Sequence, residues 1–175
     1  MSITGNIRRV APDQLKALLA APEQVQDFIY GASDVDADEE SEELSSEDGP
    51  LPLEKNWHAL HFLLTGTSWG GTPPLNFIAV GGQKVGDEDV GYGPARAFTP
   101  QQVKDISRAL EALDPEALRP RFNPGQMDDL EIYPKGWSES ADDDSLESLL
   151  GDFDALKLFL REGAEQGLGL LVYLN

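Results

Sequence analysis

The 175-residue chain is predicted to form one compact α/β (α+β) domain, spanning residues 1–175, in which a small mixed sheet is flanked by helices. Three observations predict this class. Strand-like segments lie near both ends of the chain, helical periodicities of three to four residues lie between them, and no internal repeat divides the sequence. A chain of this length can bury well over half of its unfolded surface in a single hydrophobic core.

The N-terminal part of the chain indicates a strand followed by two helices. Residues 2–10 are expected to form a short, partly buried strand. Pro12 then opens a helix, and Pro22 precedes a second helical piece that ends at Gly31. The apolar residues that define these elements are Ile3, Ile7 and Val10 in the strand, Leu15, Leu18 and Leu19 in the first helix, and Val25, Phe28 and Ile29 in the second.

An acidic segment follows at residues 33–50, SDVDADEESEELSSEDGP, which contains no lysine or arginine. Its like charges repel one another and it can bury little apolar surface, so it is predicted to be a mobile, solvated loop. The functional alternative is a docking segment for a basic partner. The spacing of Asp34, Asp36 and Asp38 resembles that of calcium ligands, but the glycine and the terminal glutamate of an EF-hand loop are missing.

The middle of the chain contains one helix and one ambiguous apolar run. Residues 53–64 are predicted to be a helix that ends at a left-handed Gly66. One face of this helix carries Trp57, Leu60, His61 and Leu64. After a loop rich in Thr, Ser, Gly and Pro, residues 76–80 (NFIAV) fit either a strand or the end of a buried helix, and periodicity does not separate the two.

The clearest helix signal begins at Thr99, an N-cap residue followed by Pro100 at the first helical position. Its buried face is predicted to consist of Val103, Ile106, Leu110 and Leu113. Asp114 and Pro115 then start a further turn, in which Leu118 makes the apolar contact.

The last third of the chain is expected to contain two strands and a long helix. Residues 130–133 are predicted to form a strand that Pro134 stops. A helix follows over residues 145–165, with an interruption near Gly151. Residues 168–174 form an apolar run that fits a terminal strand in the core.

Charge and composition exclude several classes of function. The net charge of −19, from 32 acidic and 13 basic side chains, repels nucleic-acid phosphates and anionic membrane surfaces, so neither is predicted as a partner. No apolar run approaches the roughly 18 residues that a membrane span needs, and the N-terminus lacks a signal-peptide pattern, which favours a cytoplasmic location. With no cysteine, disulfides, thiolate catalysis and Cys-based metal sites are excluded. No metal and no cofactor are predicted.

Several motifs together resemble a known bacterial family. They are KNWHALHFLLTG, GYGPARAFTPQQV, MDDLEIYP and the apolar C-terminal strand, in this order and at this approximate spacing. The chain is similar in these segments to the YfbM-like family, whose domain has no assigned function. The resemblance covers essentially the whole chain outside the acidic segment. It implies a single α/β domain with a small sheet flanked by helices, and it implies no reaction, substrate or cofactor.

His58 and His61 are the chain's two histidines, and their i,i+3 spacing places them on adjacent parts of one helical surface. Zinc normally takes three or four protein ligands, and neither a cysteine nor a third histidine completes such a set. The structural interpretation is that His61 is buried, hydrogen-bonded and orients the loop that follows the helix. The catalytic interpretation makes it a general base for Thr65, Thr67 or Ser68, although no nucleophile motif supports that role.

The segment GYGPAR, residues 91–96, precedes the helix that begins at Thr99. One interpretation places backbone amides, Tyr92 and Arg96 around an anion near the positive end of that helix. The segment matches neither a P-loop nor a Rossmann fingerprint, and a tight turn pinned by an Arg96 salt bridge is favoured instead. Tyr133 and Trp137 either line the same cleft or cover the edge of the sheet.

Two classes of function remain. The first is a non-enzymatic protein-binding module whose acidic surface, together with residues 33–50, engages a basic protein partner in the manner of an inhibitor or immunity protein. The second is a small-molecule-binding domain or enzyme, which requires its candidate residues to converge in one pocket. Those residues are His61, Thr65, Thr67, Tyr92 and Arg96. The sequence leaves the oligomeric state open.

Overall fold

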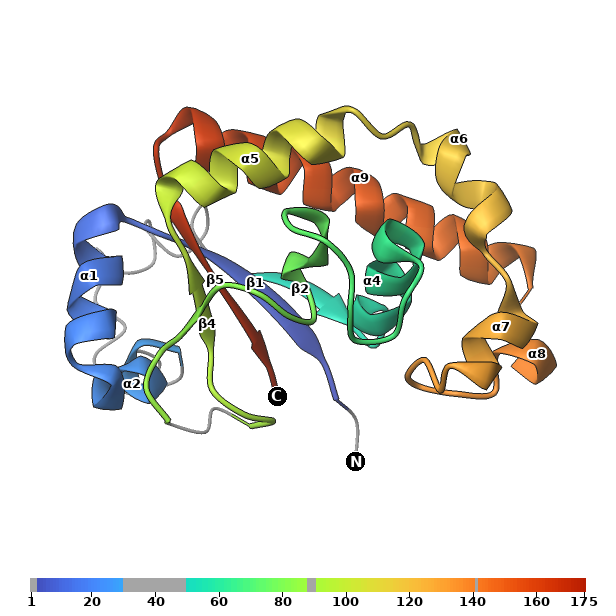
Figure 1. The fold of residues 1–175 in the computed structure, drawn as a ribbon, viewed down its shortest axis with the longest axis horizontal. Coiled ribbons are helices and arrows are strands. Elements are labelled where there is room, and N and C mark those ends of the chain that lie inside the picture. Colours follow the sequence, from blue (N-terminus) through green and yellow to red (C-terminus); the bar gives the residue numbers. More distant parts are fainter. Residues whose placement is uncertain (1–2, 30–49, 88–90, 141) are drawn as a thin grey trace, which may run out of the picture.

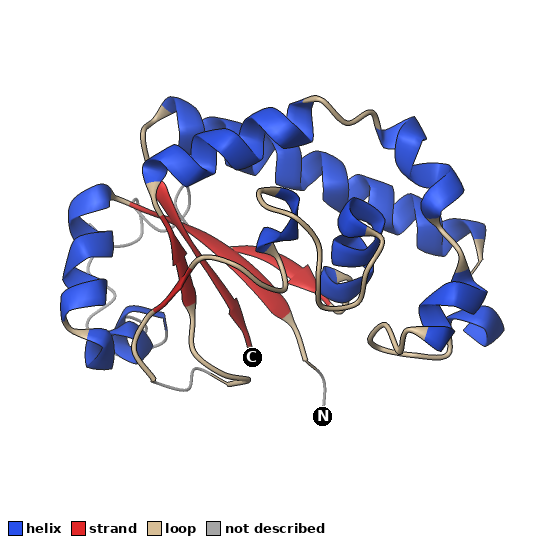
Figure 2. Ribbon diagram, viewed as in Figure 1, coloured by secondary structure: helices blue, strands red, loops and turns tan. Residues whose placement is uncertain are grey.

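A computed structural model describes residues 3–29, 50–87, 91–140 and 142–175. It confirms the predicted class, because a five-stranded sheet and eight α-helices form one α/β domain within the described residues. Figures 1 and 2 show the sheet between two groups of helices. The predicted helix end at Gly31 and the acidic segment, apart from Pro50, lie outside the described residues.

The sheet has the strand order β2-β1-β5-β4-β3. Each of its four described pairings is antiparallel, whereas a mixed sheet was expected. The two central strands come from opposite ends of the chain and pair over six residues, from Gly5 opposite Leu174 to Val10 opposite Gly169. The strands are β1 (Gly5–Val10), β2 (Leu51–Glu54), β3 (Gln83–Lys84), β4 (Arg96–Phe98) and β5 (Gly169–Leu174).

Helices account for most of the remaining described residues. The α-helices are α1 (Pro12–Ala20), α2 (Val25–Ile29), α4 (Trp57–Thr65), α5 (Pro100–Glu111), α6 (Pro115–Leu118), α7 (Pro124–Asp129), α8 (Trp137–Ser140) and α9 (Asp143–Glu165). The 3₁₀ helices are η1 (Pro22–Gln24), η3 (Leu75–Phe77) and η4 (Arg119–Arg121).

The alternation of side chains along β5 divides the interior into two cores. Leu170 and Val172 face the larger core, under α4, α5 and α9, whereas Leu171 and Tyr173 face the smaller core, under α1 and α2. Successive side chains of a strand point to opposite faces of the sheet, so a terminal strand that is apolar throughout must be covered on both sides. Figure 1 shows these two helical layers, with α1 and α2 apart from α5 and α9.

Both long helices are closed by capping boxes. Thr99 and Gln102 exchange side-chain and backbone hydrogen bonds at the start of α5, as its N-cap signal predicted, and Asp142 and Ser145 do the same for α9. The expected interruption of the second helix is wrong, because α9 continues through Gly151 to Glu165. Gly151 is exposed and a Cβ there would meet nothing, so this glycine weakens the helix without breaking it.

One predicted boundary and one predicted strand are also wrong. The helix expected over residues 53–64 begins only at Trp57, because Leu51–Glu54 pairs with β1 as a strand and Glu54 adopts a left-handed φ of 51°. Residues 130–133 form a turn after α7 instead of a strand, since Glu131 also has a positive φ, of 57°. A left-handed residue cannot continue an extended strand.

The ambiguous run NFIAV is helical in its first part. Asn76 and Phe77 lie in η3, and Ile78 follows with no exposed surface, so the run is a buried turn of helix. It packs beside α4, whose residues from Trp57 to Leu64 are all buried. A helix that is apolar on all sides belongs in the interior of a fold, and α4 packs against both η3 and α9.

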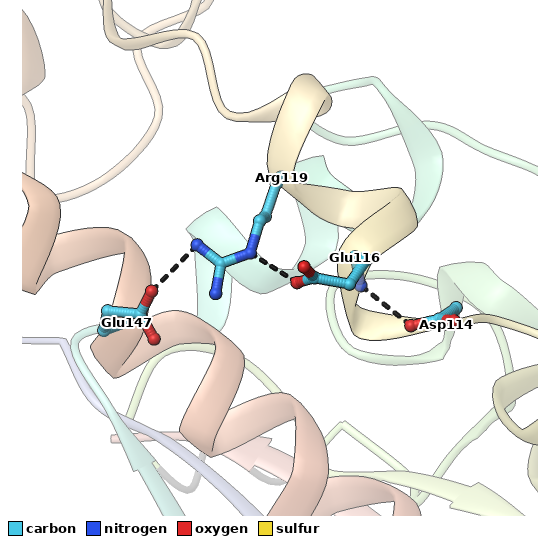
Figure 3. A network of polar contacts seen from close by, with 4 residues as sticks. All are labelled: Asp114, Glu116, Arg119 and Glu147. Carbon is cyan, nitrogen blue, oxygen red and sulfur yellow. Dashed lines mark hydrogen bonds and ion pairs between the residues drawn. The ribbon is translucent and has the colours of Figure 1, made fainter.

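Figure 3 shows how α6 is attached to α9 at the surface. Asp114 caps α6 by accepting a hydrogen bond from the Glu116 amide at 3.0 Å. Arg119 pairs with Glu116 and reaches Glu147 of α9, with 2.8 Å between Nη1 and Oε1. Exposed ion pairs of this kind add little stability, so they orient α6 while the buried Leu118 anchors it.

Two glycine substitutions should have opposite effects on the free energy of unfolding. Gly151→Ala should stabilise the protein by about 0.5–1 kcal/mol, because alanine is the better helix former at an exposed, unobstructed position. Gly5→Ala should destabilise it by about 1–3 kcal/mol, because the new Cβ would lie 2.5 Å from the Trp57 Cβ. Urea denaturation of the three proteins measures both effects, and a destabilising Gly151→Ala would contradict a continuous α9.

Candidate functional site

A pocket of about 640 Å³ lies at the end of the sheet where β5 ends and β1 begins. Its volume is within the range of small-molecule sites. Its described lining is rich in aromatic and cationic groups. The aromatic residues are Trp57, His58, Trp69, Tyr92, Tyr133 and Tyr173; the cationic residues are Lys84, Arg96 and Lys135; and the carboxylate is Glu131.

Helix α4 supplies the floor of the pocket through Trp57 and His58, both at least 98% buried. The Trp57 indole donates a hydrogen bond to the Ile3 carbonyl at 3.1 Å. Asn56, just before the helix, donates to Asp152 of α9 at 2.6 Å, where burial raises the pKa of the aspartate. The start of α4 is therefore tied both to the N-terminal segment and to α9.

His58 bridges two loops through their backbones. Its Nδ1 accepts a hydrogen bond from the Tyr133 amide, and its Nε2 lies 2.8 Å from the Ser68 carbonyl oxygen. Because the amide can only donate and the carbonyl can only accept, these bonds assign the neutral tautomer with the proton on Nε2. Burial lowers the pKa of His58, in agreement with this assignment. Both ring nitrogens are thus occupied, and neither is free to accept a proton from a ligand.

His61 is completely buried and does not line the pocket. The expected hydrogen bond is absent within the described part of the chain, where neither ring nitrogen has a partner. Burial is the largest cause that lowers the pKa of His61, to about 4, and the positive charge of Arg96 acts in the same direction. The Gly70 backbone lies near the ring and raises the pKa of His61, but its position does not satisfy the geometry of a hydrogen bond. His61 is therefore a neutral imidazole inside the core, where a substrate cannot reach it.

Thr65 and Thr67 organise the loop after α4. The Thr65 hydroxyl donates to the His61 carbonyl at 2.8 Å and lies 2.9 Å from the Thr67 hydroxyl. Thr67 accepts from the Gly70 amide at 3.1 Å. Neither threonine lines the pocket, so of the five candidate residues His61 lies in the core, Thr65 and Thr67 stabilise their loop, and only Tyr92 and Arg96 line the pocket.

Arg96 lines the pocket and fixes the neighbouring backbone through hydrogen bonds. Its guanidinium donates to the backbone carbonyls of Phe77 at 2.9 Å, Val80 at 2.5 Å and Gly81 at 3.2 Å, and also to Ile78. The expected salt bridge does not form with any described carboxylate. Burial lowers its pKa to about 10, so the group remains cationic at neutral pH.

Tyr92 stands at the pocket rim with 44% of its surface exposed, and its amide donates to the Leu174 carbonyl at 3.1 Å. β4 lies between this loop and the N-terminus of α5. One interpretation of GYGPAR placed an anion between this loop and the helix end, whereas the described lining of the pocket includes no residue from the N-terminus of α5.

Sequence reasoning missed Trp69, the most exposed aromatic residue of the pocket at 52%. Its ring centroid lies 4.7 Å from that of His58 and 5.7 Å from that of Trp57, so one side of the indole is supported while much of it faces solvent. No local pattern distinguishes it from an ordinary loop tryptophan. Of the pair at Tyr133 and Trp137, only Tyr133 lines the pocket; Trp137 is buried and donates to the Ile132 carbonyl.

The turn that carries Glu131, Tyr133 and Lys135 forms one wall of the pocket. Asp128 holds this turn by accepting hydrogen bonds from the Trp137 amide at 2.7 Å and the Ser138 amide at 2.9 Å. Bonds from the Ser138 hydroxyl and amide are the main reason that the pKa of Asp128 is lowered. Asp128 is therefore a positioning residue for the wall.

Two further features bear on the chemistry of the site. Among the described residues, no group of three or more His, Asp or Glu side chains is arranged to hold a metal ion. None of the described helices combines the length and the apolar composition that crossing a membrane requires.

Acid should destabilise this protein partly through His61. Its pKa lies near 4 in the folded state and near 6.5 when unfolded, so the unfolded chain binds the proton first and stability falls as pH decreases from about 6.5 to about 4. His61→Leu should remove up to roughly 3 kcal/mol of this pH dependence. Urea unfolding of both proteins at several pH values measures the difference, in which shared carboxylate effects cancel. Parallel pH profiles would contradict a buried neutral His61.

Comparisons with known proteins agree with this architecture. A crystal structure of YfbM from Escherichia coli, described as a protein of unknown function, matches with a TM-score of 0.72 over 98% of this chain and 99% of that one, at 24% identity, which shows a common fold. In sequence, Protein YfbM of Escherichia coli (strain K12) is 31% identical over 121 residues, 67% of this chain and 71% of the relative. The family model described as "Domain of unknown function (DUF1877)" matches residues 1–173, and the chain therefore belongs to this YfbM-like family.

Proposed function

We propose that this protein is a non-enzymatic ligand-binding domain whose pocket takes a small molecule with a flat apolar part. The exposure of Trp69 and Tyr92 at a pocket of about 640 Å³ carries this proposal. Exposed apolar surface gathered at a groove can mark a ligand-binding site, and flat aromatic rings are suitable surfaces for stacking. The five candidate residues do not converge in this pocket as the second class of function required: only Tyr92 and Arg96 line it, and the proposal rests on the exposed aromatic residues instead.

The state of the two histidines favours binding over acid–base catalysis. Both ring nitrogens of His58 are engaged by backbone groups, and His61 is enclosed in the core. A general base needs a free acceptor within hydrogen-bond reach of its substrate. The rigid His58 bridge instead holds the loop of Ser68 and the turn of Tyr133 at a fixed separation, which is the arrangement that a preformed binding pocket requires.

Ligand occupancy can be observed through the three tryptophan indole N–H signals. Trp57 and Trp69 line the pocket, whereas Trp137 does not and serves as an internal reference. In a ¹H–¹⁵N NMR screen of small fragments, planar compounds should shift the signals of Trp57 and Trp69 and leave that of Trp137 in place. Trp69→Ala should weaken their binding about tenfold, because a stacking surface is lost.

The matched control is Leu158→Ala, which truncates another exposed apolar side chain on α9, outside the pocket lining. This variant should bind the fragments as the wild type does. Fragments that shift only Trp137, or that bind equally well without the Trp69 ring, would contradict the proposed pocket.

The net charge of −19 favours a second candidate, a protein-binding module that engages a basic partner in the cytoplasm as an inhibitor or immunity protein does. A field of this sign accelerates association with a cationic protein and is screened by salt. The acidic segment 33–50 contributes strongly to this charge. This candidate needs no ligand in the pocket.

A capture experiment tests the second candidate. The intact protein and a variant lacking residues 33–50 are used as baits in native extract at low and high ionic strength. A basic partner should be retained by the intact protein at low salt and lost on deletion or at about 0.5 M salt, where the Debye length falls to a few Å. Equal retention of the same partner by both baits at both salt concentrations would contradict it.

A further inference from the structure

Resting on the proposed ligand-binding role, we infer that the pocket takes an organic anion that carries a planar ring. The ring stacks on Trp69, and the carboxylate or phosphate group lies on the side of Lys84 and Arg96. The two parts of this ligand correspond to two independent features of the pocket, one aromatic and one electrostatic.

The aromatic feature is a prearranged stacking surface. The Trp69 indole is supported by the rings of His58 and Trp57, at centroid distances of 4.7 and 5.7 Å, while 52% of the residue remains exposed. His58 is in turn fixed by backbone hydrogen bonds at both nitrogens. A surface held in this way loses little conformational freedom when a planar ring stacks on it.

The electrostatic feature is a pair of positively charged side chains that face each other across two paired strands. Lys84 of β3 and Arg96 of β4 are directly opposite in the antiparallel register, and both line the pocket. Like charges opposite each other across two strands repel. Within the described part of the chain, neither forms an ion pair with a carboxylate. An anion in the pocket would relieve this repulsion.

The remaining charges of the described pocket lining leave it locally cationic. Lys135 pairs with Glu131 at 3.6 Å, so these two side chains offset each other. Arg96 gives its hydrogen bonds to carbonyl groups, which neutralise no net charge. Among the described residues of this lining, three of the chain's 13 basic residues therefore meet one carboxylate, against 32 acidic residues in the whole chain. The described lining is thus positively charged although the whole chain is strongly negative. At short range, this local positive charge favours an anionic ligand.

Four compounds with one common ring test this inference: naphthoate, naphthyl phosphate, naphthylmethanol and naphthylmethylammonium. Dissociation constants are measured by the shift of the Trp69 indole N–H signal, with Trp137 as the reference. At least one of the two anions should bind about tenfold or more tightly than the neutral alcohol, and the ammonium compound should bind most weakly. The two anions distinguish a carboxylate ligand from a phosphate ligand.

Lys84→Gln should weaken the anions by about threefold to tenfold and leave the alcohol unchanged, since it removes an exposed charge without a structural partner. Lys16→Gln is the matched control, because Lys16 is an exposed lysine of α1 outside the pocket lining. It should change neither class of compound. Raising the salt concentration should narrow the difference between anion and alcohol.

Equal affinities for the alcohol and the anions, or tighter binding of the ammonium compound, would contradict the inference of an anionic ligand. Such a result would not contradict the proposal that the pocket binds a planar compound. The same holds if Lys16→Gln weakens the anions as much as Lys84→Gln does. If none of the compounds shifts Trp57 or Trp69, both this inference and the proposed function fail.

Discussion

The pairing of β1 with β5 is the constraint on which the rest of the structure depends. These strands lie at opposite ends of the chain, yet they form the centre of the sheet over six residue pairs. β5 then separates the two hydrophobic cores, and both cores take side chains from it. The pocket lies at the end of the same pair, where Ile3 and Leu174 contribute to its lining. Fold and site therefore share one long-range contact, which can form only after most of the chain has been made.

Helix α4 connects this framework to the pocket. It is enclosed on all sides, and its first turn is held by Ile3 through Trp57 and by α9 through Asn56. A buried helix fixed at its start has little freedom to shift, so the aromatic floor that it supplies is rigid. The walls depend on it in turn, because His58 is the link that joins the loop of Ser68 to the turn of Tyr133. Rigidity at α4 is thus transmitted to both sides of the pocket.

Local signals predicted the elements whose stability is local. Thr99, Pro100 and the periodic apolar residues after them specify α5 within a few turns of chain. Its capping box and the burial of Val103, Ile106 and Leu110 agree with that prediction, whereas Leu113 lies beyond the end of the helix and is only partly buried. The sequence also indicated the burial of His61, from its place in an apolar stripe, and the apolar terminal strand. These predictions succeed because neighbouring residues supply most of the determining interactions.

The predictions that failed concern residues whose conformation is imposed from elsewhere. The segment at Glu131 looks like a strand in sequence, but His58 accepts the hydrogen bond of the Tyr133 amide, and Asp128 accepts those of the Trp137 and Ser138 amides that follow. The hydroxyl groups of Thr65 and Thr67 bond within their own loop. Trp69 and Lys84 line the pocket because of tertiary packing, which no short sequence pattern reveals. His61 shows the same limit, because burial could be foreseen and the lack of a partner could not.

The two ends of the described chain lie against each other, with hydrogen bonds between Thr4 and Asn175 of 2.8 and 3.0 Å. Because Ile3 and Leu174 line the pocket, both ends of the described chain lie beside it. A purification tag attached near these residues therefore lies close to the pocket. A polyhistidine or acidic tag there changes the charge beside Lys84 and Trp69 before a compound is added. The molecule suited to binding studies is one from which such extensions have been cleaved, with reporter groups placed on α9 instead.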